Sequence, residues 1–337
     1  MGHRPRRYSA ACNDGPVTNS VLQVLRARSE QGSIPGQRKD EARVALVIEG
    51  GSSRGAFSSG MTVAIERLGM LPLFDAVYGS SAGALNGAWL LSLRAESTIH
   101  AWWDPVIMRG TINPKRALRR RPIVDTHFLV HRVYTEIMPM DFAEILSSPV
   151  EFHPLATDAR TGQSTDLREY IHDQTGLQAA LRATTAMPFM TGEPIEIAGR
   201  RFIDAGVSES VPVHTALAQN ATHIVALRTK RGDEQVTPPT RAERLVLSRW
   251  LARHAPGALE PWLNRVAVRG EEERLLASHP AILQIRPPLG SGDIGHTERG
   301  ETVLRQAVQD GRQAAWDVLA PCVAQEDPRL ADNERRT

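Results

Sequence analysis

The sequence of 337 residues is short of cysteine, of net charge and of long apolar runs, and each shortage excludes a class of protein. Its two cysteines, Cys12 and Cys322, stand near opposite ends, without the spacing of metal ligands or of a disulfide framework. The 40 Lys and Arg residues nearly balance the 38 Asp and Glu residues, and a formal charge of +2 gives no footprint for nucleic acid. The most apolar stretch, at 83–93, is too short and too polar to span a bilayer.

The ends of the chain differ in composition from its centre. No apolar segment follows the basic first residues, so we expect no secretory signal and a cytoplasmic protein. Residues 1–42 are rich in Arg, Ser, Asn, Gly and Pro, and predict a flexible arm that contains one short amphipathic helix at 20–30. We expect residues 43–320 to form a single domain, a size that suits one α/β unit, and residues 321–337 to form a polar tail.

The central region alternates between two kinds of segment. β-Branched and apolar runs, bounded by turn-forming residues, predict strands at 43–51, 74–80, 150–159, 195–206, 223–229 and 281–288. Helical periodicity predicts helices at 57–70, 82–94, 166–173, 177–187, 212–220 and 302–320. Strand, glycine turn and helix in repeated order are typical of an α/β fold, in which helices flank a mostly parallel sheet.

One of these turns carries a serine between two glycines. Gly79-x-Ser81-x-Gly83 follows a predicted strand and precedes a predicted helix, which is the context of a nucleophile elbow. The positions around the serine of such an elbow must be small, because backbone crowds against backbone there. The spacing selects Ser81 rather than Ser80 as the attacking hydroxyl, although a tight turn without chemistry would have the same pattern.

A second glycine-rich turn, Glu49 to Phe57, opens the preceding predicted helix. Such turns present unpaired backbone N–H groups, and the helix dipole adds positive potential, so that a phosphate or an oxyanion could bind. The P-loop pattern fails because no Lys-Ser/Thr pair follows, and the dinucleotide-binding fingerprint fails at Ser52. The turn from Glu49 to Phe57 is therefore either an anion-binding turn beside Arg54 or a turn whose glycines only permit close packing of the helix against the sheet.

A serine nucleophile needs a base, and the sequence offers two kinds. Asp204 follows a predicted strand and precedes a turn, from which its carboxylate could reach Ser81 or could only cap the loop. In an α/β-hydrolase esterase the base is a histidine, for which His214, His223 and His254 are the candidates in the chain order Ser-Asp-His.

The three motifs together resemble those of the patatin-like phospholipases. GGSSRGAF, GSSAG and DAG occur in the order and spacing of that family, and ATDARTGQ, ATTAMPFM and GRRFIDAGVSESVP fit the sequence that leads to its aspartate. The resemblance covers about residues 44–228 and is closest to bacterial members with a single compact domain. It implies the patatin-like three-layer fold and a lipid acyl hydrolase. No feature of the sequence requires a metal, and we expect no cofactor.

The resemblance also implies a role for each motif residue. Ser81 would be the nucleophile and Asp204 the base, in a dyad without histidine, and Gly79 and Gly83 would complete the elbow. The oxyanion hole would be formed by the first motif, at Gly50, Gly51, Ser52, Ser53, Arg54 and Gly55. Two positions depart from the family: Ser52 replaces the third glycine of the first motif, and Ala205 replaces the glycine after the aspartate.

The expected activity is therefore hydrolysis of a lipid ester through an acyl-enzyme. Because an aspartate with its usual pKa of about 4 is a weak base, we expect Asp204 to be partly desolvated and close to Ser81. Two alternatives to an active hydrolase remain. The protein could be a catalytically weak lipid-binding homologue, or it could belong to the class of binding proteins, as a lipid- or nucleotide-binding module without turnover.

Apolar and basic residues suggest where a lipid would lie. The candidates for an acyl channel lie close to the two turns; they are Met70, Leu71, Leu73, Phe74, Trp102, Trp103, Pro188, Phe189 and Met190. The basic stretch at 114–122 could attract anionic head groups and favours peripheral membrane contact, but such a run is also typical of a solvated face.

Overall fold

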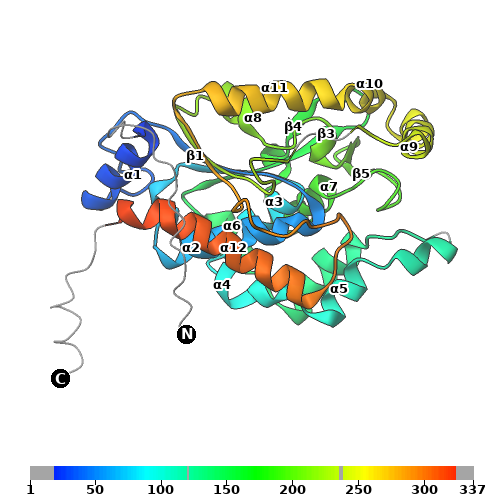
Figure 1. The fold of residues 1–337 in the computed structure, drawn as a ribbon, viewed down its shortest axis with the longest axis horizontal. Coiled ribbons are helices and arrows are strands. Elements are labelled where there is room, and N and C mark those ends of the chain that lie inside the picture. The colour runs from blue at the N-terminus through cyan, green and yellow to red at the C-terminus, as the bar shows by residue number, and fades with distance from the viewer. Residues whose placement is uncertain (1–18, 120, 235–237, 324–337) are drawn as a thin grey trace, which may run out of the picture.

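The computed structural model describes residues 19–119, 121–234 and 238–323, and its centre is an eight-stranded sheet (Figure 1). Five neighbouring strands run parallel in the order β3-β2-β1-β7-β8. At the β3 edge, β4 and β6 pair antiparallel with β3, and β5 pairs antiparallel with β6. The strands are β1 (Val44–Ile48), β2 (Ala76–Ser80), β3 (Glu151–Asp158), β4 (Ser164–Asp166), β5 (Ile195–Ile197), β6 (Arg200–Ile203), β7 (His223–Leu227) and β8 (Ile282–Ile285).

Helices cover both faces of this sheet. In β1, Val44, Leu46 and Ile48 pack toward α2, α3 and α12, whereas Ala45 and Val47 pack toward α8 and α11. The helices are α1 (Ser20–Glu30), α2 (Gly55–Arg67), α3 (Ala82–Leu91), α4 (Ala95–Thr98), α5 (Pro105–Thr111), α6 (Phe142–Ser147), α7 (Gln174–Thr184), α8 (Val213–Ala218), α9 (Arg241–His254), α10 (Leu259–Leu263), α11 (Arg265–Ser278) and α12 (Glu301–Leu319). The predicted α/β fold with a central sheet between helices is confirmed.

Most predicted elements are present with small shifts in their ends. The segment at 195–206 is a hairpin of β5 and β6 rather than one strand, because Ala198 and Gly199 take positive φ angles and reverse the chain. The helix predicted at 166–173 is wrong: only a 3-10 turn, Arg168–Tyr170, forms there. No helix among the described residues combines the length and the apolar character of a membrane span.

The first long helix of the domain is buried on every side. In α2 the residues from Gly55 to Ile65 are all buried, because the helix lies between α3 and the C-terminal helix α12. A methyl group at Gly60 would come within 2.0 Å of the Val308 carbonyl oxygen, and one at Gly311 within 2.0 Å of that of Phe57. The two glycines therefore let α2 and α12 cross in backbone contact, which fixes α2 and the turn that precedes it.

Residues 95–150, between α3 and β3, form a cap of short elements beside α3. It contains α4, α5 and α6, two 3-10 segments (Ile99–Trp102 and Pro114–Arg119) and a π-helix, Phe128–Ile137. An isolated bridge between Ile112 and Val124 closes the base of an arm that carries the basic stretch and projects from the body (Figure 1). π-Helices are uncommon and often occur at functional sites.

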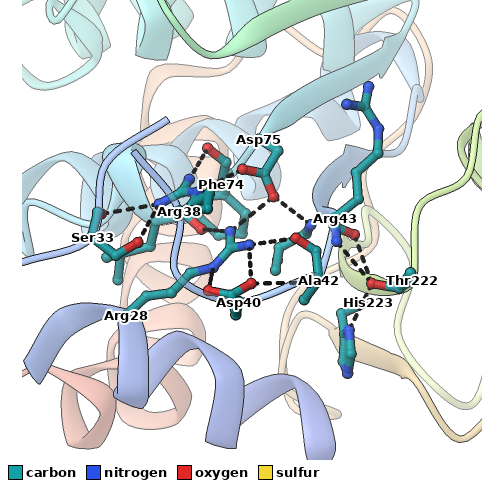
Figure 2. Close-up of polar contacts among 12 residues, drawn as sticks. Arg28, Ser33, Arg38, Asp40, Ala42, Arg43, Phe74, Asp75, Thr222 and His223 are labelled. Atoms are coloured by element: carbon teal, nitrogen blue, oxygen red, sulfur yellow. Dashed lines mark hydrogen bonds and ion pairs between the residues drawn. The ribbon is translucent and has the colours of Figure 1, made fainter. Parts of the chain in front are cut away.

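The N-terminal helix α1 is held to the domain by a buried arginine. Val21 and Leu25 belong to the main core cluster, and Arg28 is 1% exposed. Its guanidinium donates to both carboxylate oxygens of Asp40, to Asp75, and to the carbonyl oxygens of Leu73 and Ala42 (Figure 2). All five N–H donors of the side chain are thus used, which is what a buried guanidinium requires.

The expectation of a flexible arm over residues 1–42 is therefore wrong for residues 19–42. The amphipathic helix at 20–30 was predicted, but it packs on the core because Asp40 and Asp75 pair with an arginine on its buried side. Residues 1–18, and residues 324–337 of the predicted tail, lie outside the described residues.

Removal of the Arg28 side chain is expected to destabilise the fold. Arg28→Ala leaves two carboxylates without their shared partner, and breaking a buried pair typically lowers the free energy of unfolding by about 3–5 kcal/mol. Arg26→Ala is the control, since its pair with Glu30 is exposed on both sides and is worth less than about 1 kcal/mol. Urea denaturation measures both; equal, small shifts would show that the Arg28 network does not secure α1.

Candidate active site

Ser81 lies at a strained turn between β2 and α3. Its φ of 53° and ψ of −125° are unusual for a residue with a side chain, and such strain is typical of a nucleophile elbow. Methyl groups at Gly79 and Gly83 would come within 2.3 Å of the Ala84 Cα and the Ile48 carbonyl oxygen, respectively. Both glycines are thus required by close backbone contact, as the sequence pattern predicted.

The neighbouring hydroxyl of Ser80 has a different environment. It is fully buried and donates a 3.0 Å hydrogen bond to the Glu209 carbonyl oxygen. Ser81 instead lines a cavity, and its backbone N–H donates to Thr184 Oγ1 at the end of α7. The Ser80 hydroxyl therefore has a structural role, whereas the Ser81 hydroxyl is accessible from the cavity.

Asp204 meets Ser81 across the sheet edge, 123 residues away in sequence. The Ser81 hydroxyl donates a 2.7 Å hydrogen bond to Asp204 Oδ2, while Oδ1 accepts from the Gly206 N–H at 2.8 Å. Asp204 follows β6, and its backbone is fixed by a hydrogen bond from Thr157 Oγ1 to its carbonyl oxygen. Ser81 and Asp204 are each only 6% exposed. Hydrogen bonds to the backbone of each residue hold the pair in position, Ser81 after β2 and Asp204 after β6.

The environment makes the Asp204 carboxylate a stronger base than usual. Burial raises the pKa of Asp204 from 3.8 to about 6, and the hydrogen bonds from Ser81 and Gly206 and the charge of Arg269 partly oppose this effect. A carboxylate with a pKa near the working pH can accept a proton far more effectively than an exposed one. The geometry and the pKa agree with the partial desolvation that we expected for Asp204.

Arg269, on α11, is expected to tune this base. Its positive charge lowers the pKa of Asp204, so Arg269→Gln should raise that pKa and move the acid limb of the kcat/KM profile to higher pH. The plateau above about pH 8 should stay unchanged, because the carboxylate is ionised there in both proteins. Arg274→Gln, at an exposed position of the same helix, is the control. Identical profiles for the wild type and Arg269→Gln would contradict the coupling.

The candidate histidines lie elsewhere. His214 is exposed on α8, and the His223 ring is hydrogen-bonded to Thr222 Oγ1. His254 contacts Glu193 and stacks on Trp250. Within residues 19–119, 121–234 and 238–323, no histidine is hydrogen-bonded to Ser81 or Asp204. The arrangement favours the aspartate over histidine as the base.

The glycine-rich turn before α2 faces the same cavity. Ser52 and Ser53 line it with Ser81, and in the described part of the chain the backbone N–H groups of Gly51, Ser52 and Ser53 have no acceptor. Unpaired amides beside a nucleophile are suited to bind the oxyanion of an acyl-transfer intermediate. The geometry thus gives three free donors in this turn.

The other residues of that turn do not offer a free backbone donor. The Gly50 N–H donates to the Ser210 carbonyl oxygen, so the expectation that it points at the oxyanion is wrong. The N–H groups of Arg54 and Gly55 donate within the turn, the first to Gly51 and the second to Ser52 and Ser53. Gly55 has a spatial role, because a methyl group there would meet Trp102 and Ala82 within 2.8 Å.

The two departures from the family pattern have different consequences. Ser52 takes a φ of 53° in the left-handed region that favours glycine, and its hydroxyl donates a 2.6 Å hydrogen bond to the His296 carbonyl oxygen. Ala205 instead begins a right-handed 3-10 turn, Ala205–Val207, and needs no positive φ. Strain is thus present at Ser52 and absent at Ala205.

The cavity at Ser81 has mainly apolar walls. The walls and the open mouth together enclose about 890 Å³, part of which is open to solvent. Much of its wall comes from the cap: Ala95, Thr98, Ile99, Ala101, Trp102, Ile107, Met108, Thr111, Ile112, Val124, Thr126, Leu129 and Tyr134.

Only part of the expected acyl channel lines this cavity. Trp102 does, together with Met187, the neighbour of the predicted Pro188–Met190 segment. Trp103, Pro188, Phe189 and Met190 do not line the cavity. Met70, Leu71, Leu73 and Phe74 are instead buried in the main core, so the assignment of these four to the channel is wrong.

A buried ion pair that the sequence does not indicate lies behind the glycine-rich turn. Glu49 Oε2 accepts from Arg228 Nε and from the Thr229 N–H, and Thr229 Oγ1 donates to the Gly50 carbonyl oxygen. Burial raises the pKa of Glu49, but the charges of Arg228 and Lys230 and the Thr229 hydrogen bond bring it down to about 2. The pair is ionised at neutral pH and fixes the end of β1 against the residues that follow β7.

Comparison with known proteins relates the chain to one family. The sequence model of the family described as "Patatin-like phospholipase" matches residues 46–217, 172 of the 337 residues. The chain is 28% identical over 261 residues to the uncharacterized protein YjjU of Escherichia coli (strain K12); the match covers 74% of this chain and spans 66% of that protein's length. The crystal structure of VipD from Legionella pneumophila has a TM-score of 0.45 and 13% sequence identity to this chain, over 84% of this chain and 67% of VipD.

Proposed function

The chain belongs to the patatin-like phospholipase family, and from this premise we propose that it is a lipid acyl hydrolase with a Ser81–Asp204 dyad. The observation that carries the proposal is the 2.7 Å hydrogen bond from the Ser81 hydroxyl to Asp204, at the wall of an apolar cavity. A hydroxyl becomes a competent nucleophile when an adjacent base accepts its proton, and the raised pKa of Asp204 suits that task.

The first half-reaction forms an acyl-enzyme. Ionised Asp204 accepts the proton from Ser81 as Oγ bonds to the ester carbonyl carbon, and the carbonyl oxygen becomes an oxyanion. The N–H groups of Gly51, Ser52 and Ser53 stabilise that charge, each lowering the barrier by roughly 3–4 kcal/mol. When the tetrahedral intermediate collapses, the bond from carbon to the alkoxy oxygen breaks, and the proton held by Asp204 passes to the leaving alcohol.

The second half-reaction returns the enzyme to its starting state. Water donates a proton to Asp204 and attacks the acyl carbon, and the same amides stabilise the second oxyanion. Collapse releases the fatty acid, and the Ser81 oxygen regains its proton from Asp204. No residue besides the dyad has to exchange a proton in this scheme.

The cavity supports a long acyl chain as the group that is bound. Burial of apolar surface contributes about 25 cal/mol per Å², and the cap supplies an apolar wall beside the nucleophile. We also propose peripheral contact with lipid surfaces through the cap, where Leu118 is 88% exposed within the basic arm. An apolar side chain among basic residues suits an interface with anionic lipid.

Lipid turnover tests the proposed activity. The purified protein is incubated with a mixed lipid extract, and mass spectrometry follows the appearance of free fatty acids and the matching loss of esters. We expect fatty acid release by the wild type that requires both dyad residues. Release that persists without Asp204 but stops on substitution of His214, His223 or His254 would support the histidine-dependent esterase, and no release would support a lipid-binding homologue.

A further inference from the structure

The peptide between Gly50 and Gly51 is held by a side chain that does not line the cavity. Its carbonyl oxygen accepts a 2.7 Å hydrogen bond from Thr229 Oγ1. The peptide is trans, so its C=O and its N–H point in opposite directions. The Thr229 hydroxyl therefore fixes the direction of the Gly51 N–H, which points away from Thr229 and has no acceptor in the described part of the chain.

The two glycines lie directly against the nucleophile and against Thr229. A methyl group at Gly50 would come within 3.1 Å of Ser81 Cβ and within 2.8 Å of the Ser80 carbonyl oxygen. A methyl group at Gly51 would come within 2.8 Å of Thr229 Oγ1. Gly50 therefore packs against the elbow and Gly51 against Thr229, and the peptide that joins them lies next to Ser81.

The Gly50–Gly51 peptide needs such a contact to keep one orientation. Glycine reaches backbone conformations that are closed to other residues, so a peptide between two glycines can turn over with little steric hindrance. The hydrogen bond from the Gly50 N–H to the Ser210 carbonyl oxygen belongs to the preceding peptide and does not fix this one. Because donors to an oxyanion act by being aimed before the reaction, a peptide that turned over would lose the Gly51 donor.

Thr229 is itself held rigidly. It is fully buried, and its β-branched side chain has few rotamers. Its N–H donates a 2.8 Å hydrogen bond to Glu49 Oε2, and Glu49 forms a buried ion pair with the adjacent Arg228. Since Glu49 directly precedes Gly50, the Glu49 carboxylate holds the Thr229 backbone while the Thr229 hydroxyl holds the Gly50 backbone.

We propose that Thr229 is a positioning residue, which aims the Gly51 N–H at the oxyanion by holding the Gly50 carbonyl oxygen. The proposal rests on the proposed function, because it concerns a later residue that supports the same reaction. An oxyanion exists only while the reaction proceeds. Loss of the contact should therefore lower kcat and leave KM unchanged.

Thr229→Val tests the role of the hydroxyl, because valine has the same shape and no donor. With a p-nitrophenyl acyl ester we expect kcat to fall about 10- to 100-fold at unchanged KM, since removal of a whole oxyanion donor costs about 10²- to 10³-fold. Thr229→Ser keeps the hydroxyl and should retain most of the wild-type kcat. A serine variant as impaired as the valine variant would overturn the proposal.

Thr222→Val is the matched control. Thr222 directly precedes β7, and its hydroxyl donates to the carbonyl oxygen of Arg43, which directly precedes β1. β1 and β7 are parallel, so Thr222 joins them at the end away from the dyad, whereas Thr229 joins them at the end beside it. We expect Thr222→Val to change neither constant. Equal losses in both variants would mean that Thr229 only strengthens the pairing of β1 with β7.

A trifluoromethyl ketone isolates the oxyanion from the other steps. Ser81 Oγ bonds to its carbonyl carbon, the Ser81 proton passes to Asp204, and the carbonyl oxygen becomes an oxyanion that is not expelled. The affinity of Thr229→Val for this ketone should fall by the same factor as kcat, while the unreactive alcohol with the same chain binds both proteins equally. An unchanged ketone affinity, or a raised KM with unchanged kcat, would overturn the positioning role.

The wild-type ketone adduct keeps the proposal testable if Thr229→Val does not fold. A crystal structure of the adduct in which the Gly51 N–H makes no contact with the adduct oxygen overturns the proposal without any variant. If the wild type neither hydrolyses the ester nor forms the adduct, the proposed function fails, and the role of Thr229 fails with it. If the wild type, Thr222→Val and Thr229→Val react equally well, only the role of Thr229 fails.

Discussion

Ser81→Ala is expected to reduce ester hydrolysis by at least about 10⁴-fold, with no recovery at any pH. In serine hydrolases, removal of the nucleophile costs as much as removal of the whole catalytic group, because the other members have nothing to activate. Here the Asp204 carboxylate has one hydroxyl as a partner among the described side chains, and that hydroxyl belongs to Ser81. Initial rates with a p-nitrophenyl acyl ester, and labelling by a fluorophosphonate probe, measure the loss.

Ser80→Ala is the matched control for this substitution. It removes a hydroxyl at the adjacent position, but that hydroxyl is buried and bonded to the Glu209 carbonyl oxygen. We expect a loss of stability of about 1 kcal/mol with retained labelling and turnover. Equal labelling of Ser81→Ala and the wild type would contradict the assignment of the nucleophile.

The elbow turn could be predicted because local requirements fix it. Gly79 and Gly83 are needed wherever backbone packs this closely, so the spacing places Ser81 at the centre of the turn. Asp204 was found through the resemblance of its motif, and its hydrogen bond to Ser81 depends on β6 lying beside β3. That pairing is not visible in either segment by itself, so the geometry had to come from the structure.

The direction of single amides could not be read from the sequence. Gly50 and Gly51 are neighbours of the same type, but the N–H of Gly50 donates to the Ser210 carbonyl oxygen, whereas that of Gly51 has no acceptor among the described residues. The difference depends on Ser210, which is 160 residues away from Gly50. The Glu49–Arg228 pair could not be predicted for the same reason, because its two residues lie 179 positions apart in the sequence.

The cap was the largest part of the fold that the sequence did not indicate. Its helices have between four and ten residues, too short for a clear period, and one of them is a π-helix. Four of the nine residues expected at the channel, Met70, Leu71, Leu73 and Phe74, precede a core strand and pack inward. The wall of the cavity therefore depends on tertiary packing of short segments rather than on any apolar run.

Asp204→Asn is expected to lower kcat/KM by about 10³- to 10⁴-fold, because an amide fills the same space but cannot accept the Ser81 proton. In the wild type the rate should fall as pH drops through about 6, since the base must be ionised and burial raises the pKa of Asp204 to about 6. A limb of the same position that disappears on substitution of a histidine would contradict the dyad, as would an Asp204→Asn protein within tenfold of the wild type.

The same substitution is expected to stabilise the fold, and the sign follows from proton linkage. The folded protein binds a proton at Asp204 more tightly than the unfolded chain does, so wild-type stability falls as pH rises between about 4 and 6. A shift from 3.8 to about 6 corresponds to roughly 3 kcal/mol, most of it from burial of the charge. Asp204→Asn should therefore raise the melting temperature at pH 8, and its advantage should shrink toward pH 4. If Asp204→Asn is less stable than the wild type at pH 8, burial of the ionised Asp204 carboxylate does not lower the free energy of unfolding. Burial could then not be the cause of the raised pKa of Asp204.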